Sequence, residues 1–590
     1  MRTGKIKDTV AQIRTANWDF IRQNNTDLQS NFDYFYQTIK NAEDFCQPIK
    51  MKKTNIDKPW MTIEIKDMIK IRQKLYQQAT VQKSVELTKY NEFAKKVSAE
   101  ITKRKWQYNK AKTLSKPNWW KEIKDMNSVK TINLIDLKKA SMINQGFRDV
   151  WVDQKQPDLT SFINKNCDKP KEPIFTIQNV GLFLKRLKSC SSGPDGLHAK
   201  LVKASYLELV EPLTHLYNQC IYNSFTPTQW KTANITPIPK IANPALAIDY
   251  RPIANLSTID KIFQRVLAKY IVTITSKIWE TNKQYGFLPG RSTMDAILQV
   301  IEDWSKASDQ HKQLLAIFFD FEKAFDLVDH ALLLTKLSKF LPDWLISWLA
   351  SYLTERQQRV KVNGFETEWL KVEAGVIQGS VIGPILFILF IVDINDYLPQ
   401  EADLEKYADD ILSYLIGKFD CSLPQKIADG VLKWCIENKM RLNVKKCKII
   451  TLNYTPVQPI MINGEPLEEV DSYKYLGIEL NNKLNWDQQW TRVKSITSSV
   501  PFLIKRLKQQ GWPESILITI YRSHALSHFI YSAPTLTSAS TGAKHEMDRF
   551  QKRILRIINI TPSRAEKKYG IGTIPSLIDE ICARKLLNSK

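Results

Sequence analysis

The sequence lacks several features that would place it in a specialised class. Its eight cysteines are scattered, with no Cys-x-x-Cys pair and no Cys/His cluster, so neither a disulfide framework nor structural zinc is expected. The first ten residues contain no apolar core, so no secretory signal is predicted. The most apolar run, residues 385–392, is far shorter than the roughly 20 apolar residues that span a bilayer. We therefore expect a soluble intracellular protein in which residues 385–392 form a buried helix.

Acidic residues are also in short supply. The 590 residues include 85 Lys and Arg against 61 Asp and Glu, a net charge of +24. Such an excess favours a polyanionic partner, most simply nucleic acid, with an anionic membrane surface as the alternative. A hydrophobic content of 43% excludes global disorder. The length is too great for one core and predicts roughly three or four domains.

Two basic segments have open interpretations. Residues 101–121 hold seven basic residues and no acid. Aromatic residues are interleaved with these charges, namely Trp106, Tyr108, Trp119 and Trp120. Cations with aromatics suit phosphate neutralisation and base stacking, but a solvated helical face with core aromatics is equally consistent with the pattern. Residues 549–560 predict an amphipathic helix whose basic face is either solvated or bound to nucleic acid.

Composition divides the chain into three regions. Two prolines near residues 168–175 mark the first boundary, and strands alternate with helices beyond it. Residues 314–321 predict a strand, and Asn363-Gly364 and Asn463-Gly464 predict two hairpin turns. The predicted regions are 1–170, helical and basic; 171–455, mixed strands and helices; and 456–590, a hairpin region followed by helices.

Three carboxylates carry the strongest chemical signal. Asp409 and Asp410 stand side by side between two apolar stretches, which predicts a tight hairpin with acids at its tip. Asp320 ends the apolar run "LLAIFF" in a similar setting. If the two strands are neighbours, the three acids could hold two Mg²⁺ ions for an in-line phosphoryl displacement. In isolation, a surface turn is the simpler interpretation of each acid.

The segments around these acids resemble, in order, the reverse transcriptases of non-LTR (LINE-type) retrotransposons, in particular the jockey-like group. The resemblance runs through most of residues 170–500. The matching segments are "SSGPDGLHAKLVK" (191–203), "NITPIPK" (234–240), "DYRPIANLS" (249–257), "QYGFLPGRST" (284–293), "FFDFEKAFDLVDH" (318–330), "GVIQGSVIGPILF" (375–387), "YADD" (407–410), "NKMRLNVKKCK" (438–448) and "YKYLGI" (473–478).

This resemblance implies an α+β fold, the right-hand polymerase with fingers, palm and thumb around a ferredoxin-like palm sheet. It implies that Asp320, Asp409 and Asp410 are the catalytic metal ligands, joined by the backbone carbonyl of Phe321. The implied cofactor is a pair of Mg²⁺ ions, with Mn²⁺ as a substitute. The ring of Phe325 would lie against C2′ of the incoming sugar and so exclude a 2′-hydroxyl, although a core aromatic is the simpler interpretation of that residue alone.

The resemblance also implies a nucleotide site and a primer site. Lys240 and Arg251 match residues that grip the triphosphate, a role that suits a point charge and a planar fork. Gln378 and Gly379 match a pair lying along the nucleotide and template, where glycine permits close backbone approach. Lys446 matches a lysine near the leaving pyrophosphate, with adjacent Lys445 as an alternative. The matched primer-grip residues are Tyr475, Leu476 and Gly477.

The expected activity is RNA-directed DNA polymerisation, with RNA template, DNA primer or target, and dNTPs as partners and no membrane. The expected location is the nucleus or a cytoplasmic ribonucleoprotein. No motifs of an apurinic-type endonuclease precede the polymerase segments, so we expect a fragment of a larger element that relies on a separate endonuclease. The alternative is an inactive relic that binds RNA without polymerising. The oligomeric state is left open.

Overall fold

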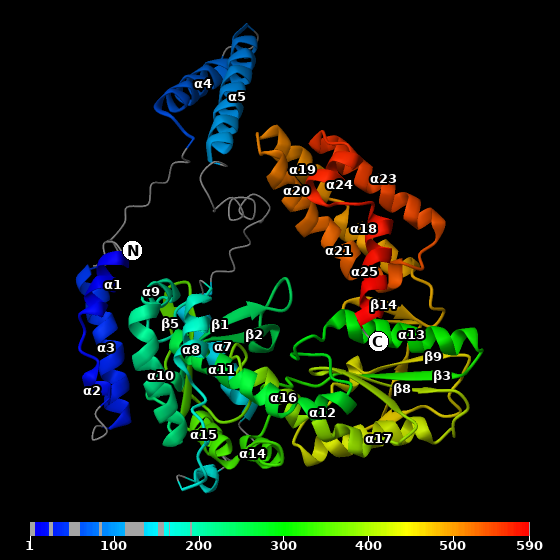
Figure 1. The fold of residues 1–590 in the computed structure, drawn as a ribbon. Helices are drawn as coiled ribbons and strands as arrows, with labels where there is room; N and C mark the ends of the chain where they lie inside the picture. Colours follow the sequence, from blue (N-terminus) through cyan, green and yellow to red (C-terminus); the bar gives the residue numbers. More distant parts are fainter. Residues whose placement is uncertain are drawn as a thin grey trace. The chain divides into compact units, whose positions relative to one another are not determined.

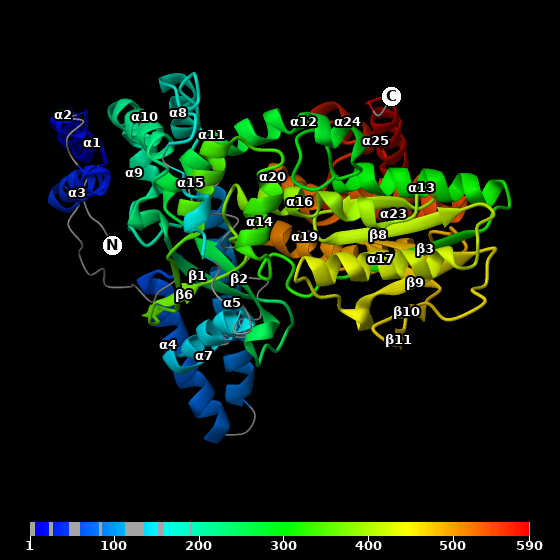
Figure 2. The same cartoon turned by 90° about the horizontal axis from the view of Figure 1, so that it is seen from below.

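The computed structural model describes residues 6–22, 27–46, 60–81, 85–112, 135–151, 158–164, 166–188 and 191–588. It is a mixed α and β structure, as predicted (Figures 1 and 2). The chain forms two compact units, each assembled from separate stretches of sequence. The first contains residues 1–51, 133–296 and 306–471, and the second contains residues 52–132, 297–305 and 472–590. The predicted division at 170/171 and 455/456 stays a prediction.

The central sheet of the first unit has the strand order β12-β9-β3-β8-β7. Its strands are β3 (Leu314–Phe319), β7 (Asp403–Tyr407), β8 (Asp410–Ile416), β9 (Lys448–Leu452) and β12 (Glu468–Glu469). β3 lies between β8 and β9 and pairs antiparallel with both, while β7 and β8 form a hairpin. The free edge of β7 is covered, because the Tyr285 amide donates to the Lys406 carbonyl (2.8 Å).

Burial on both faces explains why residues 314–319 form the middle strand. All six residues of β3 are buried, which suits a continuous apolar run. Helix α17 (Leu423–Glu437) lies along one face of the sheet (Figure 1). Its Trp434 belongs to the same core cluster as Ile317 and Phe319. Since side chains alternate along a strand, even-numbered β3 residues lie on the opposite face.

A second sheet in the first unit contains β1 (Thr232–Pro239), β2 (Tyr250–Asn255), β4 (Arg356–Val362), β5 (Phe365–Glu366) and β6 (Leu370–Val372). The predicted Asn363-Gly364 turn joins β4 to β5, with φ of 51° and 87°. Helix α7 (Leu137–Arg148) packs on this sheet, where its Ile143 and Phe147 share a small core with Tyr250 and Val360.

Helices make up most of the rest of the first unit, and α16 is the buried helix predicted at residues 385–392. The helices are α1 (Ile6–Arg14), α2 (Asp19–Arg22), α3 (Leu28–Cys46), α8 (Ile177–Lys185), α9 (Ala199–Ala204), α10 (Tyr206–Tyr222), α11 (Thr258–Ile274), α12 (Ser276–Thr281), α14 (His330–Leu337), α15 (Asp343–Leu353) and α16 (Gly383–Phe390). Helix α13 (Thr293–Asp309) is shared between the two units. The Asn463-Gly464 turn links β10 (Met461–Ile462) to β11 (Glu465–Pro466), as predicted.

The second unit is mainly helical. It contains the hairpin β13 (Ser472–Tyr475) and β14 (Ile478–Asn481), and its helices are α4 (Ile63–Val81), α5 (Val85–Lys112), α18 (Asp487–Thr497), α19 (Val500–Gln509), α20 (Glu514–Tyr521), α21 (Ser527–Tyr531), α22 (Ala533–Leu536), α23 (Thr541–Ile558), α24 (Pro562–Tyr569) and α25 (Ile574–Asn588). A π-helical turn at Arg522–Leu526 joins α20 to α21. Of the basic segment 101–121, residues 113–121, with Trp119 and Trp120, lie outside the described residues.

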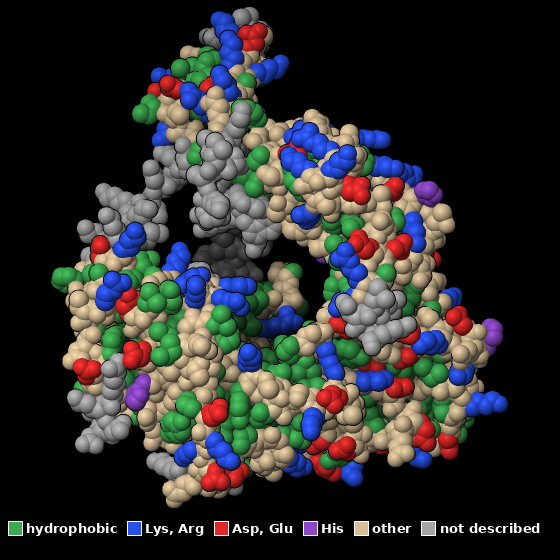
Figure 3. Space-filling model, viewed as in Figure 1, with side chains coloured by type: hydrophobic (Ala, Val, Ile, Leu, Met, Phe, Trp, Pro, Cys, Tyr) green, Lys and Arg blue, Asp and Glu red, His purple; other side chains and the backbone are tan. Residues whose placement is uncertain are grey.

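Lys and Arg side chains gather over the part of the second unit that carries α19, α23 and α24 (Figure 3). Arg549, Arg553 and Arg556 are exposed on α23 at spacings of four and three, so they share one side of the helix. We call these three residues the arginine stripe. The opposite side of α23 is buried through Ile554, Leu555 and their neighbours. Within the described residues, no helix has the length and apolarity needed to cross a membrane.

Candidate active site

The sheet register brings two of the three predicted acids together. Phe319 at the end of β3 forms the last pair of its ladder with Ile411, so Asp320 and Asp410 are the residues that directly adjoin this pair on the two strands. Both carboxylates therefore lie on the sheet face opposite α17. Asp409 occupies the tip of the β7–β8 hairpin, where the preceding Ala408 has a left-handed φ of 58°. The predicted strand and hairpin with acids at their ends are thus both present.

The three acids interact through their charges. Restricted solvation, followed by the charges of Asp409 and Asp320, raises the pKa of Asp410 to about 6. Burial and the charge of Asp320 raise the pKa of Asp409, while Arg251 opposes the shift. Among the residues the structure describes, no group of three His, Cys, Asp or Glu side chains closes around a metal position. The acids still fit hard divalent cations, because they are oxygen donors whose mutual repulsion a cation would relieve.

A glutamine side chain fixes the hairpin that carries Asp409. Oε1 of Gln284 accepts hydrogen bonds from the backbone N–H groups of Ala408 (2.9 Å) and Gly286 (2.8 Å). Gly286 lies so close that a Cβ placed on it would be 2.8 Å from the Ala408 nitrogen. Sequence reasoning missed this role of Gln284, although the residue opens the matched "QYGFLPGRST" segment.

An ion pair between the half-buried Lys283 and a buried glutamate supports the same hairpin through β7. Lys283 Nζ lies 2.9 Å from a carboxylate oxygen of Glu405, which is fully buried in β7. The neighbouring Lys406 is also fully buried, and its Nζ donates to Asn395. Burial lowers the pKa of Lys406 to about 7, although the acids at Asp393 and Glu405 oppose that shift. These contacts anchor β7 without using the acids at its tip.

Asp320 is held by the segment that follows α17. Its carbonyl accepts from Asn443 N (2.8 Å), and its own amide donates to Cys447 Sγ (3.5 Å). Lys446 Nζ lies 3.3 Å from Asp320 Oδ2, whereas Lys445 contributes a carbonyl oxygen that accepts from Lys448 Nζ. The structure therefore places Lys446 beside the predicted metal ligand.

Phe321 and Phe325, two of the predicted site residues, both have rings packed against other aromatics. The Phe321 ring lies 5.9 Å from that of Trp434, and its backbone forms an isolated bridge with Leu442. The half-buried Phe325 ring stacks on Phe387, with a centroid distance of 4.4 Å and an interplanar angle of 22°. Stacking on a buried neighbour limits how far the Phe325 ring can turn aside.

Lys240 lies within electrostatic reach of three other cations near the acids. Burial and the charge of Arg251, followed by Lys323 and Lys446, lower the pKa of Lys240, and the carboxylate of Asp326 opposes them. Lys240, Lys323 and Lys446 also line a common cavity. Such a concentration of positive charge suits a polyanionic group. The sequence analysis did not predict a role for Lys323, although a basic residue three positions after Asp320 could have indicated one.

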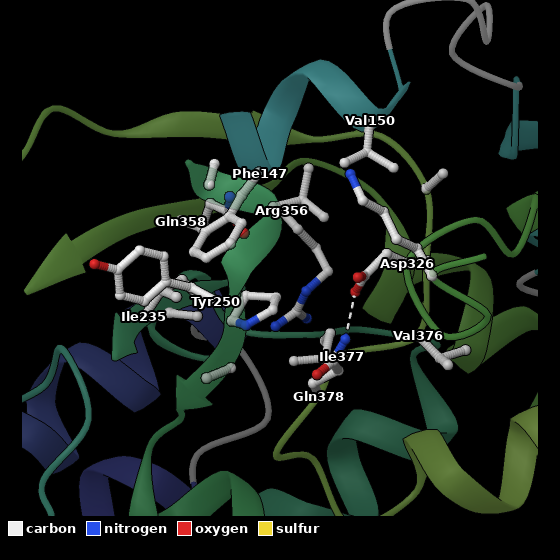
Figure 4. Close-up of a pocket in the computed structure, with 18 of the residues that line it drawn as sticks. Phe147, Val150, Ile235, Tyr250, Asp326, Arg356, Gln358, Val376, Ile377 and Gln378 are labelled. Atoms are coloured by element: carbon white, nitrogen blue, oxygen red, sulfur yellow. Dashed lines mark hydrogen bonds between the residues drawn. The ribbon is translucent and has the colours of Figure 1, made fainter. Parts of the chain in front are cut away.

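Gln378 and Gly379 form a loop against β2. The Gln378 carbonyl accepts from Ala254 N (2.7 Å), and its side-chain amide donates to Asp326 Oδ1 (2.7 Å; Figure 4). Gly379 has a φ of +115°, and a Cβ there would stand 2.5 Å from the Ala254 carbonyl oxygen. Glycine is therefore required on two grounds. Burial raises the pKa of Asp326 to about 6, with Gln378 opposing it.

This loop forms one wall of an apolar cavity in the first unit. Figure 4 shows Phe147, Tyr250, Ile377 and Gln378 around it, with Asp326 at one side. Arg356 also lines the cavity, and its guanidinium donates to the carbonyls of Tyr352 and Trp230 (both 2.9 Å). The cavity and the cationic cluster have Lys240 and Lys323 in common. An apolar surface therefore adjoins a cationic one.

The predicted primer-grip residues form the turn of the β13–β14 hairpin in the second unit. Leu476 and Gly477 have φ of 45° and 84°, which produces a tight turn. Tyr531 donates to the Leu476 carbonyl and Arg492 donates to that of Gly477, so both turn carbonyls have side-chain partners. Tyr475 is buried.

Comparison with known proteins agrees with this arrangement. Residues 238–480 match the family described as reverse transcriptase (RNA-dependent DNA polymerase). The probable RNA-directed DNA polymerase from transposon BS of Drosophila melanogaster is 31% identical over 54% of this chain and 37% of its own length. The RNA-directed DNA polymerase from the mobile element jockey of the same species is 27% identical, covering 66% and 44%. The corresponding protein of its X-element is 27% identical, covering 58% and 39%.

The chain thus spans less than half the length of these three relatives. A solved telomerase of Candida albicans, in complex with a fragment of telomeric RNA, is 12% identical with a TM-score of 0.35, covering 88% of this chain and 97% of its own. The match over residues 238–480 takes in Asp320, Asp409, Asp410 and the cationic residues around them. These residues therefore lie in the stretch that matches a reverse transcriptase domain, and the chain is similar to the RNA-directed DNA polymerases of the jockey, BS and X-element transposons.

Proposed function

We propose that this chain is an RNA-directed DNA polymerase that extends a DNA primer 3′-hydroxyl on an RNA template, with dNTPs as substrates. The observation that carries the proposal is the ladder ending at Phe319 and Ile411, which brings the adjoining Asp320 and Asp410 together beside Asp409, so that the three carboxylates interact through their charges. In this proposal the fold is a right hand. The β12-β9-β3-β8-β7 sheet would be a ferredoxin-like palm, the β1–β2–β4 sheet part of the fingers, and helices of the second unit the thumb.

Asp320, Asp409 and Asp410 would hold two divalent cations, Mg²⁺ or Mn²⁺, with the Phe321 carbonyl as a further ligand. Bound there, such cations would supply the positive charge that stabilises the attacking and leaving oxygens of an in-line displacement. The pKa values of Asp409 and Asp410 are raised first by burial and then by the charges of the neighbouring acids, and shared cations would relieve that repulsion, which supports this assignment.

The chain's own cations would bind and orient the nucleotide. Lys240 and Arg251 would hold the triphosphate, and Lys323 lies in the same electrostatic cluster. Lys446, beside Asp320, would deliver a proton to the leaving pyrophosphate. Each of these residues contributes positive charge where a polyanion must be gripped and released.

Three other groups would determine which substrates bind productively. Phe325, stacked on Phe387, would leave no room for a 2′-hydroxyl and so select dNTPs over rNTPs. Gln378 and Gly379 would lie along the nucleotide and the template. The turn of Leu476 and Gly477 would hold the primer end. In the cell, the primer end would come from a separate endonuclease acting on the DNA target.

Primer extension on an RNA template by purified protein tests the proposal. Asp409→Asn should abolish extension that depends on divalent cations, whereas Asp429→Asn on the exposed side of α17 should leave it intact. Filter binding on the same preparations shows whether nucleic acid is still bound. Full extension by the Asp409 variant would refute the assignment, and salt-sensitive binding by a wild-type protein that never extends would favour the inactive relic.

A further inference from the structure

A buried glutamine connects the core of α11 to the loop that carries Gln378. Gln264 has no solvent exposure. Its Oε1 accepts from the backbone N–H of Val381 (2.7 Å) and lies 3.4 Å from that of Ile382. Residues 378–382 are therefore tied to a helix that precedes them by more than a hundred positions in sequence. We refer to residues 378–382 as the 378–382 loop.

The other end of the Gln264 amide determines which way it points. Its Nε2 donates to Asp260 Oδ2 (2.7 Å) and to the Tyr352 hydroxyl (3.0 Å). The loop presents backbone N–H groups, which can only donate, so the amide oxygen must face the loop and the amide NH₂ must face Asp260. Asp260 is itself fully buried, and burial raises its pKa to about 7 while Gln264 and Arg356 oppose the shift. A flipped amide would set an acceptor against the Asp260 carboxylate and a donor against the loop N–H groups.

The 378–382 loop has few other means of holding its shape. Gln378 contacts Ala254 and Asp326, and Ser380 Oγ accepts from Gly383 N (2.8 Å) to start α16. Residues 378–382 belong to no strand or helix, and their backbone turns through one hydrogen bond from Ser380 N to the Ile377 carbonyl (3.1 Å). The amide of Gln264 fills that gap, because it holds Val381 between the anchored Gln378 and the first turn of α16.

We propose that Gln264 is a positioning residue of the nucleotide site, which fixes the 378–382 loop so that Gln378 and Gly379 meet the incoming nucleotide. This inference rests on the proposed polymerase function. Gln264 touches no substrate itself and acts through the loop backbone. Asp260 and Tyr352 contribute to this positioning, since they hold the Gln264 amide in the orientation that the loop requires.

Exchange of the hydrogen-bonding groups provides the test. Gln264→Glu puts a carboxylate against Asp260, whereas adding Asp260→Asn restores a donor that faces the introduced carboxylate. Gln299→Glu is a control for the substitution itself, because Gln299 donates to Asp303 on α13, outside this loop, across the same four-residue spacing with the order of glutamine and acid reversed. Hydrogen exchange of the loop amides and single-nucleotide extension kinetics are then measured for wild type, both single Gln→Glu variants and the double variant.

In Gln264→Glu the donor to Asp260 is lost, and we expect repulsion between the two acids to displace the introduced carboxylate from the loop. This displacement should speed exchange at Val381 and raise KM for dNTP by about tenfold. The maximal rate should change much less, and the double variant should restore both readouts. Unchanged exchange at Val381 would show that Gln264 does not fix the 378–382 loop. Faster exchange with an unchanged KM would show that fixing the loop has no role at the nucleotide site. A wild-type protein that cannot extend primers would instead refute the polymerase function. The exchange experiment would still show whether Gln264 fixes the 378–382 loop.

Discussion

Replacing Gly286 by alanine should damage the hairpin that carries Asp409 and Asp410. Gly286 lies against the hairpin backbone, where an added Cβ would stand 2.8 Å from Ala408 N and 3.1 Å from Gln284 Oε1. Ordinary van der Waals contact for a Cβ begins near 3.4 Å. The neighbouring backbone must therefore retreat by 3.4 − 2.8 = 0.6 Å, and because the hairpin is a backbone element it cannot simply rotate away.

That displacement is large compared with the tolerance of an active site. Productive geometry generally requires catalytic groups within about 0.5 Å of their positions. A misplacement of 1 Å can lower a rate by roughly 100-fold, so a shift near 0.6 Å should lower kcat by on the order of tenfold. The hydrogen bond from Ala408 N to Gln284 would weaken as well, with a loss of about 0.5–1.5 kcal/mol in stability.

The assay is single-nucleotide extension on a primed RNA template, together with thermal unfolding of each variant. Gly181→Ala is the matched control. Gly181 lies inside α8, and a Cβ placed on it would be 3.4 Å from a flexible methyl group of Val210 on α10, which is ordinary van der Waals contact. Alanine in a helix interior is stabilising by roughly 0.5–1 kcal/mol relative to glycine, so this control should unfold no earlier than wild type. A Gly286→Ala protein with wild-type kcat would show that the hairpin position is not set by this contact.

Three further predictions concern other parts of the chain. Because burial raises the pKa of Asp260 to about 7, the contribution of Asp260 to stability should be greatest at low pH and should fall between about pH 4 and 7. Asp260→Asn should flatten the resulting decline in melting temperature, and an unaltered pH profile would argue against the raised pKa of Asp260. Phe325→Val should relax the preference for dNTPs over rNTPs by roughly 10- to 200-fold in a competition assay, with unchanged selectivity as the contrary result. Replacing Arg549, Arg553 and Arg556 together with glutamine should reduce the slope of log affinity against log salt by roughly two to three; an equal slope would mean that the arginine stripe is only a solvated face.

Local sequence pattern was sufficient for the elements that carry the acids. A continuous apolar run ending in Asp320 predicts a buried strand, and adjacent acids between apolar stretches predict the β7–β8 hairpin. Both Asn-Gly turns were also predictable, because asparagine and glycine are the residues that readily adopt positive φ. In each case the determining interactions lie within a few residues.

The supporting contacts were not predictable in the same way. Gln264 reaches Val381 across 117 positions, and Gln284 reaches Ala408 across 124. No periodicity in composition records such a pairing, because each depends on how separate elements pack. The second unit shows the same limitation on a larger scale, since it combines residues 52–132 with residues 472–590.

Both supporting residues are neutral amides, and the charges around them explain why this matters. Oε1 of Gln284 accepts from two backbone N–H groups beside Asp409, and Oε1 of Gln264 faces two in the 378–382 loop. A carboxylate at position 284 could accept the same hydrogen bonds, but its charge would raise the pKa of Asp409 further. A lysine could not accept them at all. An amide therefore holds the backbone in place while leaving the electrostatics of the site to the acids and to the cations around Lys240.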